Sequence, residues 1–418
     1  LTAENVRVQL EQSADGRVNW EFRTGAKPAP QSEGPKRQLD LSAARDVGID
    51  VRNMALRNVD VEYLVGETRT RHYFQLQELT AEAPRDQPVR VALHGTVEKK
   101  FPYSLTFSGG LAQDLLKPDV QWPVKLSFDF VNTALQAEGM VSRNAQGEKV
   151  DLLIGMGTGD LTQIERFLQT ALPEVGAVAM SMHFRWDGRT LGFADIRGVM
   201  GRTTLEGDLR YDLSHRKAKI SGDLRLPTLD LRPFLGMKPE SDEPPKSLLD
   251  TYRELQKQTI SLRGLNSIDV DLKLGVGQWL SLPGDVRDAT LGLQLAEGKL
   301  HAPVAATIAG VPLRGEVNAD GAGELPGFEL ALGAQRTPIG GLATLLTGVR
   351  GIDGDLGTFL FRLRGQGEKL AQVLETLDVR LTVADSRLSY GNIEGGRPVD
   401  FRLDDFDVRL PGGKPLNV

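Results

Sequence analysis

The chain contains no cysteine, few aromatic residues (6%) and no long apolar run. Without cysteine there are no disulfides, no thiolate nucleophile and no Cys-ligated zinc site. No segment approaches the ~20 consecutive apolar residues of a transmembrane helix. Lys and Arg number 50 against 56 Asp and Glu, a formal charge of -6, so the basic surface of a nucleic-acid-binding protein is missing and we expect no nucleic-acid partner.

Catalytic motifs are missing as well. The five histidines are widely scattered, without the spacing of metal ligands, and there is no Gly-x-Ser-x-Gly nucleophile turn. The glycines of residues 155–160 lack the spacing and the βαβ context of a dinucleotide loop, and fit a turn from strand to helix. Asp404-Asp405 is an acidic pair that we assign to a solvated face. We therefore predict no enzymatic activity, no metal and no cofactor.

What the sequence does contain is alternation of apolar and polar residues, most clearly over residues 182–236. A period of two places the apolar residues of a strand on one face and the charged residues on the other. The apolar positions that we predict to line one face are Leu126, Phe128, Phe130, Leu205, Leu209, Tyr211, Ile220, Leu224, Leu226, Val270, Leu272 and Leu274.

The order of these patterns divides the chain into five segments. We predict the end of a preceding β unit (1–22), a flexible linker or long loop (23–48), a β unit with short helices (49–236), a proline-rich break with a helix (237–260) and a second β unit (261–418) truncated within a repeat. Short helices are predicted at 111–116, where Gly109-Gly110 starts the helix, at 159–172, where Leu161, Ile164 and Leu168 have helical spacing, and at 339–347 and 368–377. Strands are predicted up to Val131, and none between there and the helix at 159–172. Because both termini fall inside strand-like patterns, we expect the chain to be a piece of a longer protein.

Two internal correspondences indicate a repeat protein. Residues 54–91 align without a gap with 381–418, and the apolar pattern agrees throughout. In addition, Asp187-Gly188, Gly201 and Leu205-Glu-Gly207 recur as Glu297-Gly298, Gly310 and Leu313-Arg-Gly315. Glycines at fixed offsets within strands mark tight turns or bulges. The residues therefore predict a mainly β protein of repeated strands with a few short helices.

Several segments resemble the AsmA family of bacterial envelope proteins. They are Asp15-Gly-Arg-Val-Asn-Trp20, the Asn58–Tyr63 strand, the Gly95 to Gly110 segment, the helix-then-strand run Gly157–Phe184, and the Gly-Asp-Leu strands Gly207–Leu213 and Gly222–Leu231. The resemblance covers essentially the whole chain. It implies a long β-sheet curled into an apolar groove (β-taco-like), as in bridge-like lipid-transfer proteins. It also implies a periplasmic body, an inner-membrane anchor upstream, and movement of phospholipid towards the outer membrane.

A groove also agrees with the pattern itself, because each strand has one apolar face that must be covered. Together with the resemblance, which implies the two membranes, this predicts that phospholipid acyl chains are carried between the inner and outer membranes, in support of outer-membrane homeostasis. The alternative is a scaffold or assembly factor that binds envelope protein partners and carries no lipid. A carbohydrate-active β-solenoid is disfavoured by dispersed carboxylates and few aromatics, and an adhesin would have more regular repeats.

Two further questions stay open at the level of sequence. The short helices either cap the sheet or lie across the groove and gate lipid entry, and the best gate candidates are Ile339, Leu342 and Leu346, since the intervening Gly340-Gly341 weakens the helix. Likewise, the stripe of Leu126, Phe128 and Phe130 lines either a groove or a closed core.

Overall fold

The computed structural model describes residues 1–13, 17–20, 51–66, 70–115, 117–144, 147–168, 170, 172–214, 217–235, 265–280, 285–341, 351–367, 372–373, 376–391 and 398–410. Twenty strands of these residues form one sheet that is not closed into a barrel, which confirms the predicted mainly β class. The chain divides into two compact units, residues 1–172 with 176–188 (unit 1) and residues 173–175 with 189–418 (unit 2). The predicted linker 23–48, the break 237–260, and Leu342 and Leu346 lie outside the described residues.

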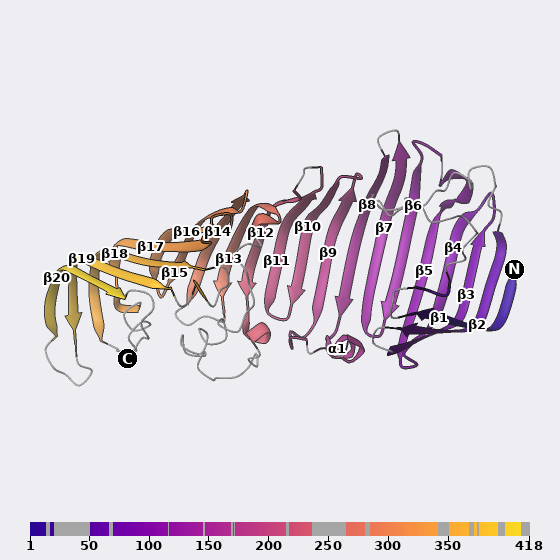
Figure 1. Ribbon diagram of the computed structural model, residues 1–418, viewed down its shortest axis with the longest axis horizontal. Helices are drawn as coiled ribbons and strands as arrows, with labels where there is room; N and C mark the ends of the chain where they lie inside the picture. The colour runs from indigo at the N-terminus through magenta and orange to yellow at the C-terminus, as the bar shows by residue number, and fades with distance from the viewer. Residues whose placement is uncertain are drawn as a thin grey trace. The chain divides into compact units, whose positions relative to one another are not determined.

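Unit 1 is an antiparallel meander preceded by one parallel strand (Figure 1). Its strands are β1 (Thr2–Gln12), β2 (Val51–Val65), β3 (Thr70–Ala83), β4 (Pro88–Val97), β5 (Phe101–Leu111), β6 (Gln121–Phe130), β7 (Thr133–Asn144), β8 (Gly147–Thr158) and β9 (Val178–Trp186). β1 pairs in parallel with β2, and each strand from β2 to β9 pairs antiparallel with the next. A 3-10 turn, η2 (Ala112–Asp114), follows β5, and α1 (Thr162–Leu168) follows β8.

Unit 2 continues the same design (Figure 1). Its strands are β10 (Thr190–Met200), β11 (Thr203–Asp212), β12 (Lys219–Leu229), β13 (Asp269–Trp279), β14 (Val286–Ala296), β15 (Lys299–Ile308), β16 (Val311–Asp320), β17 (Gly327–Pro338), β18 (Ile352–Gln366), β19 (Asp378–Tyr390) and β20 (Val399–Leu410). Only the β12–β13 pair is parallel among these neighbours, and a 3-10 turn, η3 (Arg232–Leu235), follows β12.

The structure corrects two local predictions in unit 1. Gly109 and Gly110 lie inside β5 instead of opening a helix, because the indole of Trp122 packs directly over Gly109 and leaves no room for a side chain there. The strands β7 and β8 were not predicted. β7 carries Ala137 and Gly139 on the face where its neighbours carry large residues, so its own alternation is weak and its partners decide its conformation.

The first sequence correspondence matches a bend in the backbone. Asn58 of β2 and Asp385 of β19, which are equivalent in the alignment, both have left-handed φ values, 52° and 50°. The cross-strand pairing skips both residues together with one residue of the neighbouring strand and then continues in the same register. Asn and Asp tolerate this conformation better than other non-glycine residues, so both chain segments bend at the same place for the same reason.

The second correspondence also has a structural counterpart. Gly207 on β11 and Gly315 on β16 each face a neighbouring strand so closely that a Cβ would collide with a backbone carbonyl oxygen, that of Asp223 or of Ala331. Of the matched glycines, Gly207 and Gly315 are therefore places where two strands approach closely.

The described hydrophobic core is small and local. Its cluster of buried residues comprises Val311, Leu313, Ala334, Leu356, Phe359 and Val383, from β16 to β19. It lies beside the bend at Asp385, where Thr337 and Ser386 are buried too. Most other apolar residues on the strands are half-buried, because a single sheet offers neighbours within its own layer but no second sheet to cover them.

Candidate functional site: the apolar face of each unit

In unit 1 the register brings the apolar residues of successive strands side by side. Direct cross-strand partners project from the same face of a sheet. One row of such partners, running from β4 to β9, consists of Leu93, Leu105, Phe128, Leu135, Met156 and Met180. The row beside it consists of Val91, Phe107, Leu126, Ala137, Ile154 and Met182. We call this surface the unit 1 apolar face.

Unit 2 repeats this arrangement over more strands. A row of direct partners from β12 to β20 consists of Leu224, Leu274, Leu291, Val304, Gly315, Leu332, Phe361, Leu381 and Val408. The nine predicted residues of β11, β12 and β13 all lie on this surface, the unit 2 apolar face. Tyr211, for example, is opposite Ile220, which is opposite Val270.

All twelve predicted lining residues are half-buried. None belongs to the buried cluster of unit 2. Towards β20 the face is more open still, and Val399, Phe401 and Phe406 are 62%, 42% and 43% exposed. The register thus joins the predicted residues into continuous apolar surfaces whose side chains remain partly open to solvent.

The opposite face of the sheet is polar in both units. Beside Leu126 and Leu224, for instance, Lys125 reaches Glu138 at 3.1 Å, and Arg225 reaches Glu206 at 3.8 Å. These side chains are largely exposed, so each pair contributes little to stability. These charged side chains keep this face hydrated, so one face of the sheet is polar and the other is apolar.

Aromatic residues mark both margins of the unit 1 apolar face across β5 and β6. At one margin the ring of Trp122 is buried, and its Nε1 donates a hydrogen bond of 2.9 Å to the carbonyl oxygen of Leu111. At the other margin the ring of Phe167, from α1, lies 4.9 Å from that of Phe130 and 5.4 Å from that of Phe101. Figure 1 shows α1 beyond the ends of the neighbouring strands. α1 therefore packs at the margin of the apolar face.

Of the three gate candidates, Ile339 is the one among the described residues. Ile339 follows β17 and packs against the buried cluster of unit 2, so it lies on the apolar side of the sheet. Only Gly340 and Gly341 of the predicted helix 339–347 are described as helical, since residues 342–350 are not described.

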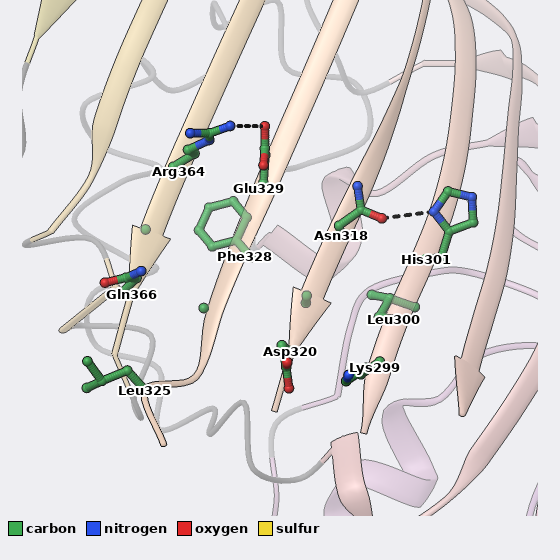
Figure 2. Close-up of a pocket in the computed structure, with 13 residues that line it drawn as sticks. Lys299, Leu300, His301, Asn318, Asp320, Leu325, Phe328, Glu329, Arg364 and Gln366 are labelled. Carbon is green, nitrogen blue, oxygen red and sulfur yellow. Dashed lines mark hydrogen bonds and ion pairs between the residues drawn. The ribbon is translucent and has the colours of Figure 1, made fainter. Parts of the chain in front are cut away.

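A hollow of about 710 Å³ lies at the ends of β15 to β18, on the polar face (Figure 2). Its walls hold two hydrogen-bonded pairs, Arg364 with Glu329 at 2.9 Å and His301 with Asn318 at 2.8 Å. These groups satisfy each other. No group of three or more potential metal ligands was found among the described residues, here or elsewhere.

One carboxylate in the described chain is deeply buried. Asp230 is 3% exposed and accepts hydrogen bonds from Arg232 Nε at 2.9 Å and Nη2 at 2.6 Å. The Arg232 guanidinium lowers the pKa of Asp230, so the carboxylate stays ionised. Thr203 Oγ1 donates to the Asp230 carbonyl oxygen at 3.2 Å and completes a link between β11 and the end of β12. We assign this cluster a structural role.

Comparison with known proteins gives no assignment: no family model, curated protein or solved structure matches the chain. No helix among the described residues has the length and apolarity to cross a membrane. Among the residues of the apolar faces, sequence reasoning missed the Phe101–Phe130–Phe167 cluster as a unit. The helical spacing of Leu161, Ile164 and Leu168 indicated α1, but nothing in the sequence shows which strand residues a helix will contact.

Proposed function

We propose that this chain binds the acyl chains of phospholipids along its apolar faces and moves phospholipid between the inner and outer membranes of a bacterial envelope without chemical reaction. The observation that carries the proposal is the register, which aligns apolar side chains over six strands in unit 1 and over nine in unit 2. A scaffold needs no such continuous, half-buried apolar surface.

The energetics favour a track of this kind. A two-tailed phospholipid has roughly 30 methylenes, and exposing each to water costs about 0.8 kcal/mol, so an unaided passage through water costs on the order of 20 kcal/mol. Continuous apolar contact removes most of that cost and needs no reactive side chain. The aligned apolar rows of each unit are a surface of this kind.

We further propose that the chain is an AsmA-like periplasmic segment with an inner-membrane anchor upstream, and that its sheet curls into a groove. The left-handed residues Asn58 and Asp385 support curling, since each interrupts the pairing of its strand with its neighbour. The support for the family remains the resemblance of the Asp15–Trp20 and Gly-Asp-Leu segments.

The proposal is tested by placing a photo-reactive amino acid on either face of the same strand. Phe128 and Leu224 lie on the apolar faces, while Lys125 and Asp223 are on the opposite face of the same strands. Protein extracted from bacterial membranes should carry phospholipid that is detectable by mass spectrometry. Irradiation should attach that lipid to positions 128 and 224 and not to positions 125 and 223.

Two outcomes would contradict the proposal. Lipid attached equally to all four positions would indicate nonspecific detergent-like association. Absence of lipid, together with stoichiometric co-purification of one envelope protein, would favour the scaffold or assembly factor.

A further inference from the structure

The connection between β8 and β9 is much longer than their pairing requires. Thr158 and Val178 are direct cross-strand partners, so a two-residue turn would join the strands. β6 and β7 are joined in this way through residues 131–132. Between β8 and β9, residues 159–177 intervene instead. Connections of this length are uncommon in compact domains and usually have a function of their own.

This connection contains α1, a helix that depends on its surroundings. Its start is fixed by Asp160, whose Oδ1 accepts a hydrogen bond of 2.9 Å from the Thr162 backbone N–H. A helix of seven residues is too short to be stable alone in water. α1 is therefore held by the side chains that it packs against the sheet.

The clearest of these contacts is made by Phe167. Its ring meets Phe130 and Phe101 edge-on, with interplanar angles of 73° and 77°. Phe130 in turn stacks on Phe128, at 6.4 Å between ring centroids, and so belongs to the unit 1 apolar face. Leu168, the next residue of α1, is 51% exposed and serves as a matched control. The ring of Phe167 thus covers two aromatic residues at the margin of the apolar face.

We infer that Phe101 and Phe130 form a subsite for one hydrocarbon chain, which Phe167 occupies when no lipid is bound. The inference rests on the proposed function and adds to it the place where an acyl chain enters or leaves the unit 1 apolar face. Lipid and Phe167 compete for the same two rings, so lipid binding displaces the Phe167 ring. α1 is short, and Phe167 is its aromatic residue in contact with the sheet. Displacing the Phe167 ring therefore breaks two ring contacts and no strand pairing.

The ring contacts of Phe167 determine by how much it lowers the affinity of the subsite for lipid. Each edge-to-face contact favours the closed arrangement by roughly two- to twelvefold. The affinity of a ligand that binds only the open form is reduced in proportion to the open fraction. Because Phe167 makes two such contacts, Phe167→Ala should raise the affinity for a single-chain lipid roughly 5- to 150-fold. Leu168→Ala should leave the affinity unchanged, and Phe130→Ala should lower it because the subsite itself is lost.

The test uses delipidated protein and monomeric myristoyl lysophosphatidylcholine. 4-Fluorophenylalanine is incorporated at position 167 in one sample and at position 107, within the apolar face, in another. We expect both fluorine resonances to move on titration, with the signal at position 167 shifting towards its solvent-exposed value. Affinities of the Phe167→Ala and Leu168→Ala proteins are measured by calorimetry, after circular dichroism has shown unchanged strand content.

The outcomes separate the two proposals. A shift at position 107 without a shift at position 167, or equal affinities of the two alanine variants, would overturn the subsite and leave lipid binding intact. No response at either position would remove both proposals.

Discussion

Leu224→Asn should slow lipid transfer strongly while leaving the sheet folded. Leu224 is the first residue of the row that crosses the unit 2 apolar face from β12 to β20, with Leu274 opposite on β13 and Gly207 opposite on β11. Asparagine has nearly the same size but places an amide where the proposed lipid contact is hydrocarbon. Asp223→Asn is the matched control, since Asp223 is the adjacent residue, on the polar face opposite Asp208 and Lys273.

The structure sets the expected magnitudes. Full burial of a leucine side chain stabilises a protein by about 1.5–3 kcal/mol, and Leu224 is only half-buried, so the variant should lose about 1–1.5 kcal/mol of unfolding free energy. An amide left without a partner against hydrocarbon costs a further ~1–3 kcal/mol. That cost corresponds to transfer slowed roughly 5- to 150-fold at this point of the track.

The assay measures movement of a fluorescent phospholipid from donor to acceptor vesicles, where dilution from a quencher raises the signal. The Asp223→Asn protein should match the unmodified protein. Denaturant unfolding of all three proteins gives the stability change separately. The reasoning would be refuted if Leu224→Asn transferred lipid at the unmodified rate, or if Asp223→Asn slowed transfer equally.

The other predictions concern the elements that shape the sheet. Asp230→Asn should lower the unfolding free energy by about 1–3 kcal/mol at pH 7, because Arg232 loses its ionised partner. Since Arg232 lowers the Asp230 pKa, its stabilisation is complete above the unfolded value near 3.9 and is lost as the pH falls through the folded pKa. Urea unfolding should therefore show the two proteins converging at low pH, and a constant gap would contradict this. Replacing Asn58 or Asp385 by Val should cost about 1–2 kcal/mol, whereas Gly should be tolerated, because their φ values are positive. Equal melting temperatures of the Val and Gly variants would show that the bends do not constrain these residues.

Most strands could be predicted because their alternation is strong. In β6, Leu126, Phe128 and Phe130 alternate with polar residues, and their face was assigned correctly. β7 was not predicted. The β7 residue opposite Leu126 is Ala137, which is small, so the apolar and polar positions of β7 differ little in hydrophobicity. Gly109 was wrongly predicted to start a helix. Position 109 requires glycine because the ring of Trp122, a residue of the neighbouring strand β6, leaves no room for a side chain, and the local sequence does not show this contact.

The sequence predicted which residues of the candidate site are apolar and share a face of their strand, but not which of them are neighbours across strands. The faces of Leu224 and Leu274 followed from local period, but their being direct neighbours required the parallel pairing of β12 with β13 across a long intervening segment. The contact of Phe167 with Phe101 is of the same kind, because the two residues are far apart along the chain.

Local sequence patterns were enough to predict the strand-rich character, the apolar side of most strands and the repeated glycines. These properties depend on backbone preferences and on the period of side-chain direction, which act within a few residues. Only the tertiary structure decided which apolar residues stand next to each other across strands, where the buried cluster of β16 to β19 forms, and which rings α1 contacts. Those choices depend on hydrogen-bond register and packing between distant segments, and no local pattern encodes them.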